Sequence, residues 1–304
     1  MKKWFIRLTL IVLGVLLTLI VLASGAFLIV NRTNGSLISS GERRTYLLYV
    51  PESYNPDVPT PLVISIHGFA DWPAHHMGIS HWNTLADRYG FIVVYPTGTH
   101  FPLRWRTYEA VDDDNELMRD VTFISDLIDK LASKYNIDSS RVYANGLSNG
   151  GGMSFALACK LSERIAAIGS VSGAYLLPWD KCDSSRPVPA IIFHGTADPI
   201  VPYQGGRSGI FHIPFPAVPK WVSALSNHNG CDETPLDLPG TGTTSGVQYK
   251  NCDADVVFYT IVGGGHTWPG GGSIPENIAG RSTNDIDATQ IMWDFFQKHP
   301  LSGK

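Results

Sequence analysis

The sequence lacks the charge pattern of a nucleic-acid-binding protein. Its 304 residues carry 23 Lys and Arg against 27 Asp and Glu, a net charge of -4, and no basic patch stands out along the chain. Affinity for a phosphate backbone comes from clustered Lys and Arg, so we expect no nucleic-acid partner. With 44% hydrophobic and 16% charged residues, the composition also excludes a disordered or fibrous protein and a multi-span membrane protein.

Cysteine is scarce, and the four cysteines are widely spaced. No two of them are close enough in sequence to suggest a cysteine metal site, and we expect no metal and no other cofactor. They form two local pairs, Cys159 with Cys182 and Cys231 with Cys252. Four cysteines allow three pairings, of which we favour bonds within these local pairs over free buried thiols. Two disulfides would indicate an oxidising compartment.

Acidic residues are absent from the first 41 positions, and any charge is absent from Leu8–Val30, a run of 23 mostly apolar residues. A helix of about 20 such residues spans the hydrocarbon core of a bilayer. The cations that precede the run favour a cytoplasmic N-terminus and export of the rest; they are Lys2, Lys3 and Arg7. We therefore expect residues 1–30 to form an uncleaved anchor helix in the membrane.

A cleaved signal peptide is the alternative for the same segment. Ser24-Gly25-Ala26 offers small residues for cleavage, but the mature chain would then begin with the apolar Phe27–Val30. Both interpretations place the body of the protein outside the cytoplasm. Residues 31–41, rich in Gly, Ser and Asn, are predicted to be a polar tether.

The remaining residues, 42–304, contain no internal repeat, no proline-rich linker and no change of composition, which predicts one domain. Short runs of β-branched and aromatic residues predict strands at 45–50, 62–67, 91–95, 141–145, 166–171, 190–194 and 256–261. Apolar residues at helical spacing predict helices around 121–131 and 288–296. Strands that alternate with helices predict an α/β fold with a mostly parallel sheet covered on both faces.

A G-x-S-x-G motif carries the clearest chemical signal. Gly146-Leu147-Ser148-Asn149-Gly150 follows a predicted strand and precedes a predicted helix. A sharp strand-to-helix turn exposes the serine as a nucleophile, and small flanking residues leave it room. The pattern alone also fits an ordinary glycine-rich turn, so its partners decide its meaning.

Candidate partners follow Ser148 in the order acid, then histidine. Asp198 comes just after the predicted strand 190–194, and catalytic groups of open α/β sheets gather at such carboxyl ends. His266 lies in a glycine-rich loop after strand 256–261. We predict a catalytic Ser148-His266-Asp198 triad. The backbone N–H groups of Phe69, after the strand 62–67, and of Asn149 are the predicted oxyanion donors.

Several segments together resemble one family, the poly(3-hydroxybutyrate) depolymerase-like esterases, with feruloyl and acetylxylan esterases as close relatives. They are Arg44–Tyr54 (RTYLLYVPESY), Pro61–Gly68 (PLVISIHG), Gly146–Gly151 (GLSNGG), His194–Tyr203 (HGTADPIVPY) and Gly263–Gly270 (GGGHTWPG). The resemblance implies an α/β-hydrolase fold and a serine esterase, with an ester as substrate and the same three triad residues. The alternatives are a feruloyl- or acetylxylan-type carbohydrate esterase and an inactive hydrolase fold used for binding at the cell surface.

The substrate is less defined by the sequence. Many family members carry paired cysteines after a tryptophan that Trp105 matches, whereas this chain has none there, and it shows no linker to a polymer-binding module. Soluble esters or oligomers are therefore expected rather than solid polymer. We predict that Trp268, two residues after His266, lines the substrate pocket. Two other clusters are interpreted as solvated or capping side chains rather than metal sites; they are His75, His76 and His81, and Asp112-Asp113-Asp114 with Glu116.

Overall fold

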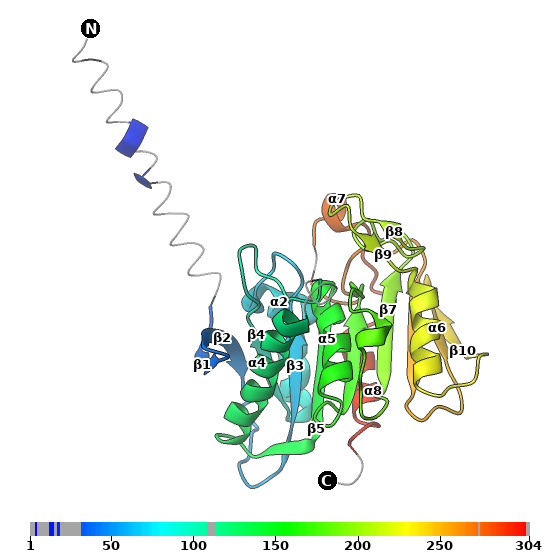
Figure 1. The fold of residues 1–304 in the computed structure, drawn as a ribbon, viewed down its shortest axis with the longest axis horizontal. Helices are drawn as coiled ribbons and strands as arrows, with labels where there is room; N and C mark the ends of the chain where they lie inside the picture. The colour runs from blue at the N-terminus through cyan, green and yellow to red at the C-terminus, as the bar shows by residue number, and fades with distance from the viewer. Residues whose placement is uncertain are drawn as a thin grey trace.

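The computed structural model describes residues 4, 12–14, 17–18, 32–108, 114–272 and 274–301 (Figure 1). The predicted anchor or signal peptide lies almost wholly outside these residues, as do Asp112 and Asp113 of the acidic cluster. Among the helices that the structure describes, none is long and apolar enough to cross a bilayer.

A ten-stranded sheet forms the centre of the molecule, in the order β1-β2-β4-β3-β5-β6-β7-β12-β11-β10. Its six central strands run parallel to one another, which confirms the predicted mostly parallel sheet. They are β4 (Ile92–Pro96), β3 (Thr60–Ile66), β5 (Ile137–Leu147), β6 (Ala167–Val171), β7 (Ala190–Gly195) and β12 (Val256–Ile261). Each overlaps a predicted strand, as does β2 (Glu42–Tyr49), which pairs antiparallel with β4.

Helices cover both faces of the sheet, as expected (Figure 1). Within β3, Leu62 and Ile64 pack into one hydrophobic cluster and Val63 into the other, because side chains alternate across a strand. The helices of the first cluster are α4 (Asp114–Ala132), α5 (Asn149–Lys160) and α6 (Val218–His228). Those of the second are α2 (Pro73–Ser80), α3 (Trp82–Tyr89) and α8 (Ala288–Phe296).

Both edges of the sheet differ from the sequence-based expectation. The predicted tether is wrong over Gly35–Ser39, which forms β1 and pairs antiparallel with β2. Ser40 and Gly41 both adopt positive φ, the conformation that a tight hairpin turn requires. At the other edge the segment between Cys231 and Cys252, where no strand was predicted, forms a second hairpin. Its strands are β10 (Leu236–Thr241) and β11 (Thr244–Gln248).

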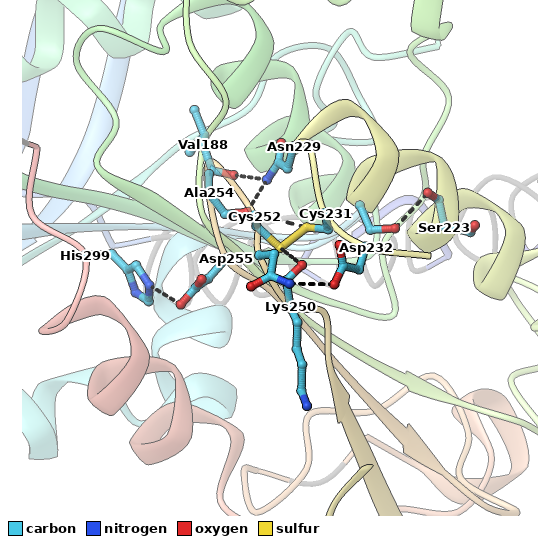
Figure 2. Close-up of a disulfide and its surroundings, with 12 residues drawn as sticks. Val188, Ser223, Asn229, Cys231, Asp232, Lys250, Cys252, Ala254, Asp255 and His299 are labelled. Atoms are coloured by element: carbon cyan, nitrogen blue, oxygen red, sulfur yellow. Dashed lines mark hydrogen bonds and ion pairs between the residues drawn. A yellow bond between two sulfur atoms is a disulfide. The ribbon is translucent and has the colours of Figure 1, made fainter. Parts of the chain in front are cut away.

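Two disulfides lie at the amino-terminal end of the parallel strands, and they confirm both favoured pairings. Cys159 lies in the last turn of α5, just before the chain enters β6, and bonds Cys182. Cys231 follows α6 and bonds Cys252 ahead of β12 (Figure 2). Beside that bond the Asn229 amide donates to two backbone carbonyls, of Val188 at 3.0 Å and of Ala254 at 3.1 Å.

The remaining short elements lie between these parts. They are the 3₁₀ helix η2 (Trp179–Lys181), the two-residue strands β8 (Gly206–Arg207) and β9 (Pro214–Phe215), and α7 (Glu276–Ala279). Strands β8 and β9 pair with each other and not with the large sheet.

Candidate active site

Ser148 occupies the tight turn between β5 and α5. Its backbone has φ 59° and ψ -120°, a conformation that non-glycine residues rarely adopt and that marks strain at functional sites. The Ser148 N–H donates to the Val171 carbonyl at 2.9 Å, which fixes the turn against β6. A Cβ at Gly146 would collide with the backbone of Gly150, and one at Gly150 with the Ile66 carbonyl. The turn therefore requires glycine on both sides of the serine.

Asp198 and His266 lie in contact at the ends of neighbouring strands. The Nδ1 of His266 is 2.8 Å from Oδ2 of Asp198, and both side chains are buried. The other carboxylate oxygen, Oδ1, accepts backbone N–H bonds from Ile200 and Val201, both at 2.8 Å. Because β7 and β12 are adjacent and parallel, their following loops meet at this point.

The Asp198 carboxyl is ionised in this setting. Burial by itself would raise its pKa, but the charge of His266 and the hydrogen bonds of His194 and His266 outweigh burial and hold the pKa well below its usual range. An ionised carboxylate only accepts hydrogen bonds. His266 must therefore carry its proton on Nδ1, which leaves Nε2 free to accept a proton in the neutral ring.

The predicted oxyanion donors lie around Ser148. Gly68 is so close that a Cβ built on it would lie 3.4 Å from the Ser148 Cβ. Phe69 and Asn149 line the same cavity as Ser148. Asn149 is the first residue of α5, and the first N–H groups of a helix have no partner within that helix. Its N–H also lies at the positive end of the helix dipole.

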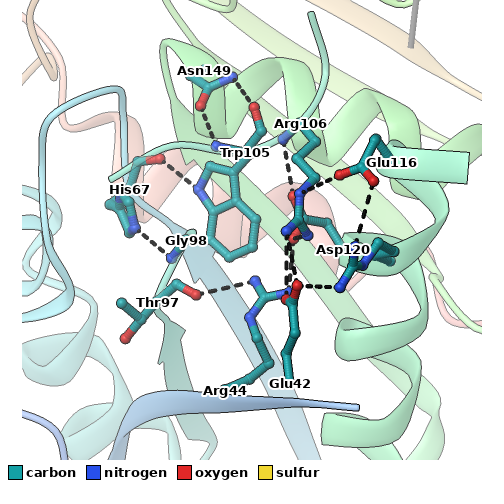
Figure 3. A network of polar contacts seen from close by, with 11 residues as sticks. Glu42, Arg44, His67, Thr97, Gly98, Trp105, Arg106, Glu116, Asp120 and Asn149 are labelled. Atoms are coloured by element: carbon teal, nitrogen blue, oxygen red, sulfur yellow. Dashed lines mark hydrogen bonds and ion pairs between the residues drawn. The ribbon is translucent and has the colours of Figure 1, made fainter. Parts of the chain in front are cut away.

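Trp105 connects the segments that carry these two donors (Figure 3). The Trp105 backbone N–H donates to the Asn149 side-chain oxygen at 2.7 Å, and its carbonyl accepts from the Asn149 amide at 3.1 Å. Its indole N–H donates to the carbonyl of His67 at 3.0 Å. His67 Nε2 in turn accepts from the Gly98 N–H at 2.9 Å. One buried tryptophan thus holds both sides of the proposed oxyanion site.

A buried ionic cluster holds the Trp105 segment through the next residue, Arg106 (Figure 3). Asp120 of α4 accepts from Arg44 at 2.8 Å, and from the backbone N–H and the guanidinium of Arg106 at 2.9 and 3.2 Å. These three side chains are each at most 4% exposed. Burial raises the pKa of the Asp120 carboxyl, while attraction to Arg44 and Arg106 opposes that rise. Arg106 also pairs with Glu42 at 3.3 Å and Glu116 at 3.1 Å.

Ser148 lines two cavities. The larger has a volume of about 430 Å³ and is mostly apolar. Its lining includes Trp105, Tyr108, Leu176, Val201, Ile213 and Phe215. The smaller, of about 260 Å³, also contains His266, together with Asp71, Trp72 and His75. Ser148 lines both cavities, as do Phe69, Ile200 and Phe211.

An aromatic pair lines both cavities. The rings of Phe69 and Phe211 pack edge to face, with centroids 5.1 Å apart. Phe211 belongs to the loop between β8 and β9, so this small hairpin supplies a wall of the site.

The prediction that Trp268 contacts the substrate is not supported by the structure. Its side chain has no exposed surface, and it lines neither cavity that Ser148 lines. The indole N–H donates to Thr289 at 2.8 Å, and the ring packs edge to face on His76. Trp268 is therefore core, whereas Trp105 reaches the larger cavity.

His75, His76 and His81 lie in three different environments. His75 pairs with Asp71 at 2.6 Å, and this hydrogen bond raises the pKa of His75. Burial lowers the pKa of His76 to about 3, so that ring is neutral. His81 joins α2 to α3 with a positive φ. Sequence reasoning missed the carboxylate of Asp71, although its spacing of four residues from His75 was a usable signal. No cluster of three metal-ligating side chains occurs in the part of the chain that the structure describes.

Comparison with known proteins identifies esterases. The family model of the esterase PHB depolymerases matches residues 44–177. A putative esterase of Nocardia uniformis is 30% identical over 288 residues, covering 86% of this chain and 82% of that protein. A probable feruloyl esterase C of Aspergillus oryzae is 29% identical over 73% of this chain and 76% of its own length.

A third relative is longer than this chain. A bifunctional acetylxylan esterase/xylanase of Neocallimastix patriciarum is 35% identical over 164 residues, which are 54% of this chain but only 23% of that protein.

Solved structures show the same α/β-hydrolase fold. An acetyl xylan esterase from Aspergillus awamori superposes with a TM-score of 0.62 at 18% identity, covering 86% of this chain and 98% of that one. A ferulic acid esterase from Anaeromyces mucronatus gives a TM-score of 0.54 at 15% identity over 88% of this chain and 90% of its own.

Proposed function

This chain belongs to the family of PHB depolymerase-like and feruloyl-type esterases and is a carboxylic ester hydrolase; on that premise we propose that it is a serine esterase acting through Ser148, His266 and Asp198. The observation that carries the proposal is the juxtaposition at the carboxyl ends of β5, β7 and β12. A strained serine lines the same cavity as a histidine whose Nδ1 is held by a buried carboxylate.

In the proposed mechanism Ser148 attacks the ester carbonyl while Nε2 of His266 takes its proton. Asp198 keeps His266 in the required tautomer and stabilises the ring when it becomes charged. His266 then protonates the leaving alcohol, and an acyl group remains on Ser148. Water, deprotonated by the same histidine, releases the acid and restores the serine.

The backbone N–H groups of Phe69 and Asn149 are proposed to stabilise the developing oxyanion. The contact between Gly68 and Ser148, together with the position of Asn149 at the start of α5, supports this role. Donors held in place before reaction do not need to reorganise as charge develops. The bonds of Trp105 to Asn149 and to the His67 carbonyl would maintain that arrangement.

The larger cavity favours a bulky or aromatic acyl group over acetate. Its volume of about 430 Å³ and its lining of aliphatic and aromatic side chains would bury far more apolar surface than an acetyl group presents. The smaller cavity, which contains His266, would receive the alcohol, because that histidine must protonate the leaving oxygen. A feruloyl-type ester or a short hydroxyalkanoate oligomer fits this division better than an acetylated sugar.

The proposed catalytic domain comprises residues 42–304, preceded by β1. Two disulfides support a location outside the cytoplasm, where such bonds persist. Retention in the membrane through residues 1–30, against cleavage and secretion, is proposed from the sequence alone.

A single experiment tests the triad and the acyl preference. Purified full-length protein and its Ser148→Ala variant are assayed on matched acetate, butyrate and feruloyl esters of one chromogenic alcohol. We expect kcat/KM of the wild type to rise with acyl size, and the variant to lose at least about 10³-fold on every ester.

A second protein, with Ser154→Ala, is the control, because Ser154 is a buried serine of α5 outside the cavities. Near-wild-type activity of Ser148→Ala would refute the nucleophile. A wild type without activity on any ester would favour the alternative of an inactive hydrolase fold that only binds. Acetate esters as the best substrates would refute the acyl assignment.

A further inference from the structure

A second histidine lies against the triad carboxylate. His194, in β7, has no exposed surface, and its Nε2 is 2.9 Å from the Val201 carbonyl oxygen and 3.3 Å from Oδ2 of Asp198. That carboxylate oxygen is the same one that His266 contacts at 2.8 Å. Asp198 is thus held between two imidazole rings, one from β7 and one from the loop after β12.

The surroundings determine which nitrogen of His194 carries the proton. Nε2 faces a backbone carbonyl and a carboxylate, both of which only accept hydrogen bonds. An unprotonated Nε2 would therefore oppose two acceptors at short distance. Nδ1 has no hydrogen-bond partner among the residues that the structure describes. The hydrogen bonding of this ring is therefore directed toward Asp198 and Val201.

The two acceptors of His194 belong to one tight turn. Asp198 Oδ1 accepts from the N–H groups of Ile200 and Val201, and His194 binds the Val201 carbonyl. Ile200 and Val201 both line the larger cavity. The ring therefore links the position of the triad acid to the position of the wall that the acyl group would contact.

We propose that His194 is a positioning residue of the esterase reaction, which as an Nε2–H donor fixes the Asp198 carboxylate and moderates its pull on His266. The inference rests on the proposed triad. Without the His194 donor, less of the negative charge on Oδ2 would be offset, so protonated His266 would be favoured. The serine proton could then be accepted only at higher pH.

The other titratable groups near His266 must be kept constant in the test. Asp198 faces the Nδ1 of His266, and Asp71 and His75 line the same smaller cavity as His266. The hydrogen bond to Asp71 raises the pKa of His75, so this ring can also contribute to the pH profile. The contribution of His75 to the pH profile is the same in variants that differ only at position 194, so it cancels in their comparison.

The experiment compares two substitutions in the full-length protein. His194→Gln keeps an N–H donor at about the reach of Nε2, whereas His194→Phe fills similar volume without a donor. We expect His194→Phe to lower kcat by about 10- to 100-fold with little change in KM, because a displaced catalytic group loses its alignment. The acid limb of its pH–rate profile should move to higher pH. His194→Gln should retain kcat within about 3-fold and keep the wild-type acid limb.

A readout that does not need activity separates this inference from the proposed function. In a Ser148→Ala background, NMR of the His266 Nδ1 proton should show the wild-type resonance with Gln at position 194 and a shifted one with Phe. Equal kcat, acid limb and resonance in the Gln and Phe variants would overturn the positioning role. If the Phe variant does not fold, His194→Asn, whose shorter amide does not reach Asp198, takes its place under the same criteria. Wild-type activity in Ser148→Ala would instead overturn the proposed triad and leave the NMR comparison valid.

Discussion

The two ends of the parallel strands are stabilised by different means. At the amino-terminal end there are two disulfides. One includes Cys159, which precedes β6, and the other includes Cys252, which precedes β12. At the carboxyl-terminal end, Ser148, Asp198 and His266 are placed by hydrogen bonds, glycine contacts and a buried ionic cluster. Covalent links restrict the unfolded chain, whereas the polar contacts determine geometry within a few tenths of an ångström. Substitutions at the two ends should therefore separate stability from activity.

Within the carboxyl-terminal end, the two halves of the site also differ. The acid and the histidine depend on a few local contacts around one turn, from Asp198 to Val201. The oxyanion side depends on long-range contacts, since Trp105 reaches Asn149 and Arg106 reaches Asp120. A substitution at the acid or the histidine should therefore lower activity alone. A substitution on the oxyanion side should lower both activity and the stability of the fold.

The largest effect on activity is expected from Asp198→Asn. The amide keeps the shape of the carboxylate but no longer fixes the Nδ1 proton of His266, so the wrong tautomer is favoured. We expect kcat to fall by about 10³- to 10⁴-fold, as measured with a soluble chromogenic ester. The free energy of unfolding should change much less than the activity.

Asp253→Asn is the matched control, because Asp253 lies ahead of β12, near the amino-terminal end of the strands. Full activity in Asp198→Asn would contradict the assignment of the triad acid and would direct the search to the carboxylates between β6 and β12.

Asp120→Asn should affect both stability and activity. It leaves the buried guanidinium groups of Arg44 and Arg106 without their shared carboxylate, which typically costs about 3–5 kcal/mol. The Trp105 segment loses its support, so kcat should also fall, by about 10-fold or more. Chemical denaturation and kinetics at a temperature where the variant stays folded measure the two effects.

Arg119→Ala provides the comparison, since Arg119 pairs with Glu42 and Glu116 at the exposed rim of the same cluster. Exposed pairs contribute only about 0–1 kcal/mol, so this variant should remain close to wild type in both measurements. Equal losses in the two variants would mean that the buried part of the cluster has no special role.

The sequence was sufficient for the parts of the fold whose signal is local. Strands β3 and β12 were predictable because both of their faces pack into the core, which requires continuous apolar runs. Strand β1 was not, because its five residues, only two of them apolar, form a strand through pairing with β2. Most residues of β10 are exposed, and its short Leu-Asp-Leu alternation is followed at once by Pro and Gly, so the strand carries only a weak local signal.

The same distinction applies to the site. Motif spacing placed Ser148, Asp198 and His266 in one order along the chain, and the fold brings the last two into contact. Nearness in sequence misled for Trp268, which lies two residues from His266 but is fully buried in the core. Trp105 is far from Ser148 in sequence, and only the folded chain shows that its backbone binds Asn149. The role of His194 likewise depends on a turn that brings Val201 back to it.

The smallest effect on activity is expected at the amino-terminal end, from the double variant Cys231→Ser and Cys252→Ser. This bond closes a loop of about 20 residues around the β10–β11 hairpin and lies at the opposite end of the parallel strands from the site. Its loss should lower the free energy of unfolding by about 3 kcal/mol, through the greater freedom of the unfolded chain. The value of kcat should stay within about 2-fold at a temperature where the variant is folded, because Asn229 still ties Val188 to Ala254. Thermal unfolding and ester kinetics on the same preparation provide the test, with reductant-treated wild type as the reference. A loss of kcat comparable to that of Asp120→Asn, with the chain still folded, would show that the two ends are coupled and would remove the separation between stability and activity.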